Sequence, residues 1–213
     1  MIDLGPATSQ LARIVREVRD DQLTAATPCR DTTVGDLLDH VDGVAMAFTA
    51  TATKTRLPEG QGQASADASR LADDWRTRIP ARLAALAQAW QDDSAWTGMT
   101  QAGGLDLPGE LAGVIALDEV IVHGWDIAVA SGQDFHCEPE LAAAALGFAR
   151  QAAARNPEGT PGLFGPPVPV PAQAAVLDQL LGFTGRDPAW HPADVGGAAA
   201  GADRGRPWAG DRD

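Results

Sequence analysis

Apolar residues recur at helical spacing in six separate segments of this chain, and this periodicity constrains the fold more than any other feature of the sequence. The strongest pattern covers residues 110–131 and ends at a plausible helix stop, Gly132. Its apolar positions are Leu111, Val114, Ile115, Val122 and Ile127. No apolar run approaches the ~20 residues that span a bilayer. The pattern therefore predicts an all-α fold, a bundle of five or six helices with room for a small hairpin.

Five other segments carry the same signal less strongly. They are residues 6–19, a segment that begins at Thr32 or Thr33 and runs to about Phe48, and residues 67–90, 139–155 and 172–183. Pro80 lies inside one of them and predicts a kink or a break there. The pair Gly103-Gly104 predicts either a short hairpin or a loop. After residue 192 the apolar periodicity fades, which predicts a helical domain over 1–192 and a disordered tail over 193–213.

Composition narrows the choice of function. The 213 residues include 16 basic and 29 acidic side chains, a formal net charge of −13. This charge argues against binding to nucleic acid or to an anionic membrane. The two cysteines are too few for a disulfide framework, and no signal peptide is visible at the N-terminus. We therefore expect a cytoplasmic protein.

A carboxylate and an imidazole lie four residues apart in the 110–131 segment. Glu119 and His123 project from adjacent turns of one helical face. A buried pair of this kind is costly unless its members pair or bind something, so an inward face would indicate a ligand site. The same spacing also occurs on exposed helices as a weak surface pair, and the spacing by itself leaves both interpretations open.

His40 lies in the second helical segment, between the apolar residues Leu38 and Val41. A lone histidine in such a place is often only a core or boundary residue. Bundle cores, however, are a common place for metal sites built from facing helices. Two imidazoles and one carboxylate form a three-ligand set with an open position, which is the composition of catalytic zinc sites.

Three motifs, in order, carry a family resemblance. The first is TPCRD at residues 27–31 with TVGDLLDH at 33–40, the second is DEVIVHGWD at 118–126, and the third combines FGPPVPVP at 164–171, LDQLL at 177–181 and GRDP at 185–188. Together they resemble the DinB-like superfamily over about residues 7–192. The match is closest to the mycothiol-dependent maleylpyruvate isomerase type of N-terminal domain, in its compact actinobacterial form.

The resemblance implies a DinB-like four-helix bundle that holds one divalent metal, usually zinc, on three protein ligands. By position these are His40, Glu119 and His123, the residues that the helical-face argument selects. It also implies a low-molecular-weight thiol such as mycothiol as cofactor. Thr32 stands where the family often has tryptophan, and the isomerases carry an extra C-terminal domain where this sequence has only the expected tail. The resemblance therefore implies the fold and the metal site more strongly than it implies maleylpyruvate as the substrate.

Two acidic residues are candidates for orienting a ligand imidazole. Asp126 lies three residues after His123, and Asp36 lies one turn before His40. A surface or capping role fits Asp126 equally well, and a contact with the helix dipole fits Asp36 better.

Other side chains near the motifs have less defined roles. Trp125 and Arg30 are candidates for cofactor contacts. The alternative roles are core packing for Trp125 and a salt bridge for Arg30. Cys29 would need a neighbouring base to act as a nucleophile, and an inert buried thiol is the simpler interpretation. Cys137 beside His136 would need two further ligands to hold a metal.

The functional hypothesis is an enzyme, a metal-dependent transferase or isomerase that uses a thiol on a small electrophilic substrate. The first alternative is a non-enzymatic bundle that binds a metal or a small ligand. The second is a metal-dependent hydrolase, in which water attacks instead of a thiol. The class of bundle allows a homodimer, although no segment of the sequence demonstrates one.

Overall fold

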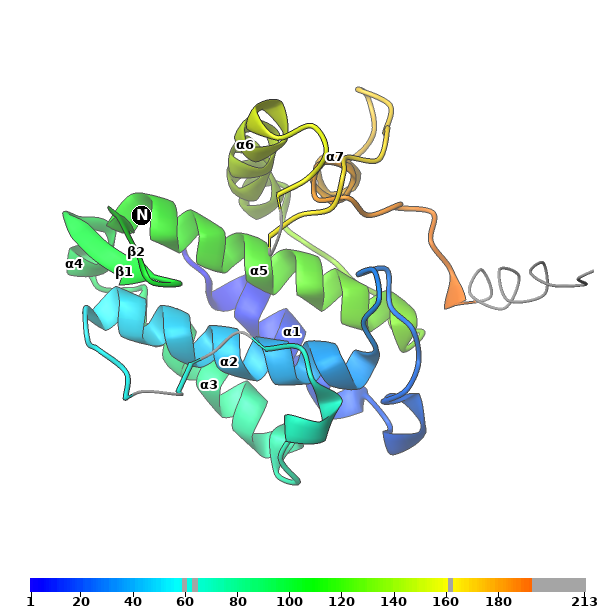
Figure 1. Ribbon diagram of the computed structural model, residues 1–213, viewed down its shortest axis with the longest axis horizontal. Coiled ribbons are helices and arrows are strands. Elements are labelled where there is room, and N and C mark those ends of the chain that lie inside the picture. Colours follow the sequence, from blue (N-terminus) through cyan, green and yellow to red (C-terminus); the bar gives the residue numbers. More distant parts are fainter. Residues whose placement is uncertain (59–60, 63–64, 161–162, 193–213) are drawn as a thin grey trace, which may run out of the picture.

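Helices dominate the computed structural model, which describes residues 1–58, 61–62, 65–160 and 163–192 (Figure 1). The expected tail over 193–213 lies outside the described residues. The long helices are α1 (Gly5–Glu17), α2 (Val34–Thr53), α3 (Trp75–Ala89), α5 (Gly109–Ala130), α6 (Pro139–Arg155) and α7 (Val176–Phe183). Short elements are the 3-10 turns η1 (Asp20–Gln22) and η2 (Ala68–Arg70), helix α4 (Asp93–Trp96), and strands β1 (Met99–Ala102) and β2 (Leu105–Pro108). The predicted all-α class with a small hairpin is confirmed.

Four of these helices close a bundle. Helix α1 packs on α3 and α5, and α2 packs on the same two neighbours, so the four form a ring. Helix α6 packs against α5 and pairs with α7, and Figure 1 shows this pair on the side of α5 that faces away from α3. None of the helices in the described segments is long and apolar enough to cross a membrane.

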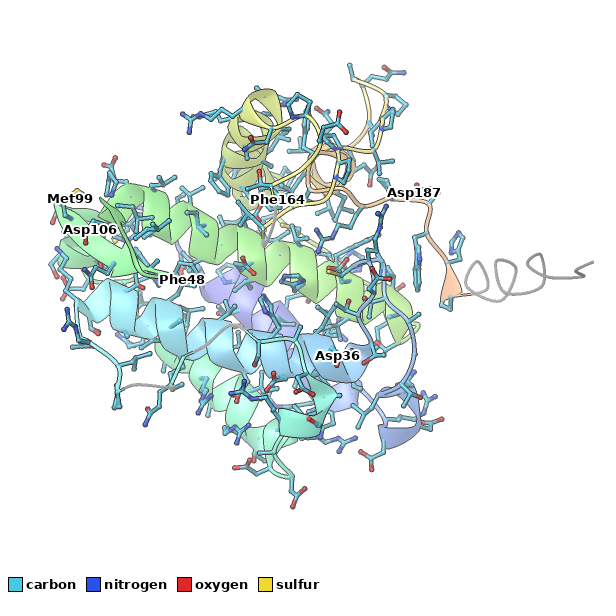
Figure 2. The ribbon with its side chains drawn as sticks, viewed as in Figure 1. Asp36, Phe48, Met99, Asp106, Phe164 and Asp187 are labelled. Carbon is cyan, nitrogen blue, oxygen red and sulfur yellow. The ribbon has the colours of Figure 1, made fainter. Side chains whose placement is uncertain are left out.

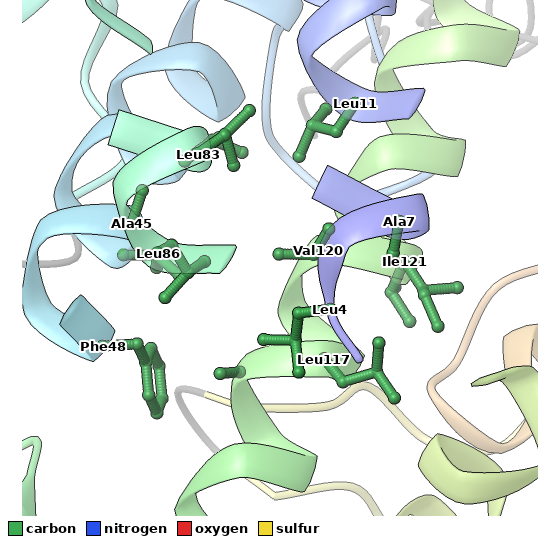
Figure 3. Packing of buried hydrophobic residues seen from close by; sticks show 14 of the residues in the cluster. Leu4, Ala7, Leu11, Ala45, Phe48, Leu83, Leu86, Leu117, Val120 and Ile121 are labelled. Atoms are coloured by element: carbon green, nitrogen blue, oxygen red, sulfur yellow. The ribbon is translucent and has the colours of Figure 1, made fainter. Parts of the chain in front are cut away.

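Interlocking apolar side chains fill the centre of the bundle (Figure 3). The residue before α1 and all four bundle helices contribute to it: Leu4, Leu11, Ala45, Phe48, Leu83, Leu86, Leu117, Val120 and Ile121. Burial of each large side chain contributes roughly 1.5–3 kcal/mol. The core therefore fixes the rotation of each helix and decides which residues of α2 and α5 face one another.

Several helix boundaries differ from the sequence-based prediction. Helix α3 begins at Trp75 instead of residue 67, because Asp67 caps the separate turn η2. The helix continues through Pro80 without a break, with the proline side of the helix buried in the core. Helix α7 begins at Val176 instead of residue 172, since a turn closed by the hydrogen bond from Ala174 N to Pro171 O comes first.

The Gly103-Gly104 pair makes a hairpin and not merely a loop. Strand β1 pairs antiparallel with β2, and the two glycines adopt φ of 57° and 80°. A two-residue turn that matches the twist of a hairpin needs positive φ at both positions, which glycine supplies without strain. Thr100 Oγ1 donates to Thr51 O, and Thr51 Oγ1 donates to Gln101 O, so the hairpin is fixed to α2.

The close packing of α5 on two tryptophans gives a stability test. A Cβ on Gly113 would lie 2.5 Å from Trp96 Cζ3 and 2.8 Å from Trp90 Cζ3. We expect Gly113→Ala to lower the free energy of unfolding by about 1–3 kcal/mol, because overpacking outweighs the gain in helix propensity. Gly147→Ala is the matched control, since its Cβ meets nothing within 4 Å, and it should raise stability by about 0.5–1 kcal/mol. Urea unfolding measures both changes, and equal stabilisation by the two substitutions would contradict the packing.

Candidate metal centre

The start of α2 determines where His40 points. Thr33 caps the helix: its hydroxyl accepts from Asp36 N at 3.2 Å, and Asp36 Oδ2 accepts from Thr33 N at 2.8 Å. Leu37 and Leu38, one turn further on, are buried in the core. With the cap and the apolar face both fixed, His40 lies on the side of α2 that faces α5.

Glu119 and His123 meet His40 across the gap between α2 and α5. Glu119 Oε2 lies 3.2 Å from His40 Nε2 and 3.3 Å from His123 Nε2. The two imidazole rings meet edge to face, with centroids 4.7 Å apart and an interplanar angle of 76°. The side chains of His40, Glu119 and His123 are 18%, 14% and 12% exposed, respectively. The structure therefore brings together the three residues that the sequence analysis selected.

The other ring nitrogen of each histidine faces an oxygen. His40 Nδ1 lies 3.2 Å from the carbonyl oxygen of Ser65, and His123 Nδ1 lies 3.1 Å from Asp126 Oδ2. A carbonyl oxygen only accepts, so it favours a proton on His40 Nδ1. Hydrogen bonds of this kind orient the imidazole and leave Nε2 as the nitrogen available to a metal.

Each of these two acceptors is held in place by a further side chain. Asp39 Oδ2 accepts from Ser65 Oγ at 2.6 Å and from Asp67 N at 3.3 Å, which fixes the loop that carries the Ser65 carbonyl. Asp126 is completely buried and forms an ion pair with Arg186, whose Nη2 lies 2.9 Å from Asp126 Oδ2. Both histidines are thus supported from behind by groups that are themselves fixed.

Opposing electrostatic effects act on the cluster. Burial alone would raise the pKa of Glu119, but its close contacts with His123 and His40 outweigh it and hold that pKa well below its usual range. Burial would lower the pKa of His123, yet its hydrogen bonds with Asp126 and Glu119 raise it to about 10. A divalent cation would take the place of the proton on His123.

The donor set fits a single divalent cation. Ligand atoms of His40, Glu119 and His123 all lie within 4.8 Å of one another. A second group within the same distance is Cys29, His123 and Asp126. Because Arg186 already engages Asp126, the first group is the better candidate. Two imidazole nitrogens and one carboxylate oxygen suit zinc and leave a position open.

A pocket of about 680 Å³ opens over the cluster. His40, Glu119 and His123 line it on one side, and the loop at residues 28–30 forms its edge. Residues 163–169 and 184–186, which we call the C-terminal wall, line the opposite side. Figure 2 shows Phe164 on the segment between α6 and α7, above α5. The volume falls in the range of small-molecule sites.

The remaining predicted residues divide between the pocket and other places. Arg30 is exposed and lines the pocket. Trp125 is buried and is not part of this pocket, because a residue two positions after His123 is rotated by about 200° around the helix. Asp36 does not orient His40 either: its Oδ2 serves the helix cap, and its Oδ1 accepts from Ala68 N at 2.8 Å.

Three contributors to the site were missed by the sequence analysis. Ser65 acts through its backbone carbonyl, which no side-chain pattern reports. The position of Asp39 directly before His40 could have indicated a role at the site. Its hydrogen-bond partner Ser65, however, lies on a loop 26 residues away. Arg186 lies in the GRDP motif, yet nothing in the sequence pairs it with Asp126, 60 residues earlier.

Comparison with known proteins identifies similar sequences. Residues 4–128 match the profile of the mycothiol maleylpyruvate isomerase N-terminal domain. Two relatives, described as uncharacterized proteins of two Mycobacterium tuberculosis strains, are each 30% identical over 183 residues, which cover 84% of this chain and 93% of the relative. No solved structure matches. The matched profile includes His40, Glu119 and His123, whereas the C-terminal wall lies beyond it.

The two cysteines are both free thiols in different surroundings. Cys29 is half-buried and lines the pocket. Cys137 is half-buried near the start of α6, and its thiol donates to Glu138 O at 3.5 Å. Within the described residues, no group of three ligand atoms includes Cys137. The interpretation of His136 and Cys137 as a metal pair therefore gains no support.

Cys137 should be an unreactive thiol. Burial raises its pKa from 9.0 to about 11, which lowers the thiolate fraction at pH 8 by about a hundredfold. We expect iodoacetamide to label Cys137 far more slowly in the folded chain than in urea, as measured by peptide mass spectrometry. The unfolded chain is the control, because both thiols are then exposed. Equal labelling rates for Cys137 in the two states would contradict its burial.

Proposed function

We propose that this chain, which belongs to the mycothiol maleylpyruvate isomerase N-terminal domain family, is a divalent-metal-dependent enzyme that uses a low-molecular-weight thiol. The proposed metal is zinc, and the proposed ligands are His40, Glu119 and His123. The proposed reaction is S-transfer to a small electrophilic substrate or its isomerisation. The family description supports the link to mycothiol.

One observation carries the proposal. Two imidazoles, from two facing helices, lie within 3.3 Å of one carboxylate oxygen of Glu119, and the three side chains line the wall of a pocket large enough for a small molecule. A purely structural zinc site is normally closed by four ligands, often thiolates. A three-ligand set beside open space is the arrangement that leaves room for a reacting group.

The metal would supply the reactive chemistry. Zinc with an open position lowers the pKa of a thiol bound to it, so that a thiolate nucleophile is present at neutral pH for transfer, or for addition and elimination across an alkene. The chain's own residues orient the proposed metal ligands and line the pocket. Ser65 and Asp126 hold the two imidazoles, and the C-terminal wall bounds the pocket on its other side.

The pocket also has features that suit two small ligands. Pro28, Leu163 and Phe164 give it apolar surface, which fits the body of an electrophile. Arg30 lies at its edge with no ion pair to any described residue, so its charge is available to an anionic group of a substrate or cofactor. Neither cysteine belongs to the proposed ligand set, and the reacting thiol would therefore arrive as a cofactor.

Metal retention tests the proposed ligands. We expect the purified chain to bind one zinc ion and His123→Ala to lose it, because that substitution removes an imidazole and leaves Glu119 with one partner fewer. His136→Ala is the matched control, since His136 is exposed and outside the cluster. Metal content after dialysis, measured by mass spectrometry, decides the matter. Stoichiometric zinc in the His123→Ala variant would show that the ligand assignment is wrong.

A thermal-shift panel tests the thiol. We expect mycothiol, or a simpler thiol such as N-acetylcysteine, to raise the Tm of the zinc-loaded chain and not of the zinc-free chain, because the thiol would bind at the open metal position. His123→Ala and the alcohol analogue N-acetylserine are the controls.

Two other outcomes would redirect the proposal. A thiol-dependent shift that does not need zinc would contradict thiol binding at the metal and favour a small-ligand-binding bundle. Release of acid from ester substrates without added thiol would favour a metal-dependent hydrolase.

A further inference from the structure

Residues 166–169, which we call the proline stretch, form the part of the C-terminal wall with the fewest hydrogen-bond donors. All four residues line the pocket, and three of them are prolines, which have no backbone N–H. Val168 has an N–H that is already engaged, because it donates to Gly182 O at 2.8 Å. Proline and valine side chains carry no polar atoms. The proline stretch therefore has no donor left to offer a ligand.

The carbonyl oxygens of the proline stretch are in the opposite situation. Within the described part of the chain, none of the four accepts a hydrogen bond from another residue. A proline-rich backbone of this kind makes no internal hydrogen bonds and is solvated by water. A ligand that enters the pocket displaces this water, and a carbonyl that loses its water without gaining a donor weakens binding. The proline stretch is thus a surface of hydrogen-bond acceptors only.

Packing on α7 decides which of these carbonyls are available. Proline fixes its own φ and holds the residue before it in an extended conformation. The backbone of Val168 turns toward α7, since its N donates to Gly182 O and a Cβ on Gly182 would lie 2.8 Å from Val168 O. Carbonyls of neighbouring residues in an extended backbone point to opposite sides. The carbonyls of Pro167 and Pro169 therefore point away from α7, and both residues line the pocket.

The edge of the pocket at Arg30 has the complementary chemistry, because a guanidinium only donates hydrogen bonds. The turn that carries Arg30 is fixed: Cys29 O accepts from Thr32 N at 3.3 Å and from Thr32 Oγ1 at 2.7 Å. The proline stretch is also fixed, by its rings and by its close packing on Gly182. Acceptors and donors are thus held at separate, preorganised places in one pocket.

We propose that the proline stretch determines the specificity of the pocket: it selects a reactant with hydroxyl, amide N–H or ammonium donors over a similar reactant that only accepts hydrogen bonds. The inference rests on the function proposed above, because it concerns the ligands of the same pocket. Either the thiol or the electrophile can carry these donors. An ether or ester in their place leaves the carbonyls of Pro167 and Pro169 without partners.

A pair of thiols that differ in their donors provides the first test. 1-Thioglycerol has two hydroxyls, whereas 2,3-dimethoxypropane-1-thiol keeps both oxygens as acceptors and has no hydroxyl donor. We expect the zinc-loaded chain to bind the diol roughly 5- to 30-fold more tightly, because the diol satisfies carbonyls that the ether leaves unpaired. Isothermal titration calorimetry measures both affinities. Equal affinities, or tighter binding of the ether, would overturn the inference for the thiol.

Pro169→Ala gives the proline stretch a donor and tests whether the preference arises there. The new N–H points to the same side as the carbonyl of residue 169 and can donate to an ether oxygen, so the preference for the diol should fall by about threefold or more. Pro171→Ala is the matched control, since Pro171 does not line this pocket, and it should leave the preference unchanged. A loosening that weakens both thiols alike cancels in the ratio of affinities. An unchanged ratio in Pro169→Ala would overturn the inference.

A second pair of ligands asks the same question without a thiol. Succinimide and N-methylsuccinimide are unreactive relatives of small alkene electrophiles, and only succinimide has an N–H donor. NMR titration of the unaltered chain and of Pro169→Ala measures their affinities. A preference for succinimide that falls in Pro169→Ala assigns the donors to the electrophile, and a preference within the thiol pair alone assigns them to the thiol.

The outcomes separate this inference from the proposed function. No preference in either pair would overturn the inference, while thiol binding that requires zinc would leave the proposed function standing. If neither thiol binds the zinc-loaded chain but the preference for succinimide is present and falls in Pro169→Ala, thiol use is wrong and the role of the proline stretch stands.

Discussion

A carboxylate between two imidazoles, near the centre of a helical bundle, is the constraint on which the rest of this structure depends. Glu119 lies 3.2 Å from His40 and 3.3 Å from His123, and the cluster is largely withdrawn from water. An unpaired charge in such a place is costly, so the fold must hold all three side chains in register. The cap of α2, the loop at Ser65 and the buried Asp126 all serve that requirement.

The site is divided between two parts of the chain. The region that matches the family profile, residues 4–128, supplies the bundle and the three proposed ligands. Helices α6 and α7 and the C-terminal wall follow the matched region, and the wall lines the pocket beside the cluster. The wall contributes apolar surface to the pocket, while the bundle contributes the charged cluster.

The sequence predicts the parts of this site that depend on local spacing. Glu119 and His123 share a helical face, so their proximity follows from periodicity, whereas their meeting with His40 was expected from the bundle architecture and from the family resemblance. Trp125 is close to His123 in sequence but lies outside the pocket, because its angular position on α5 differs. The roles of Ser65 and Arg186 could not be predicted from the sequence. Ser65 contributes a backbone carbonyl, and Arg186 contacts a residue 60 positions earlier. The same limit applies to the fold: the long helices follow from periodicity, whereas the start of α3 depends on the capped turn before it.

X-ray absorption at the zinc edge, recorded on the zinc-loaded chain without added thiol, tests the central claim most directly. Coordination by His40, Glu119 and His123 predicts only nitrogen and oxygen neighbours, at about 2.0–2.2 Å, with the outer scattering of two imidazole rings. A sulfur neighbour at about 2.3 Å would place the metal on Cys29 instead. That result, or the absence of imidazole scattering, would contradict a metal centre built on these three side chains.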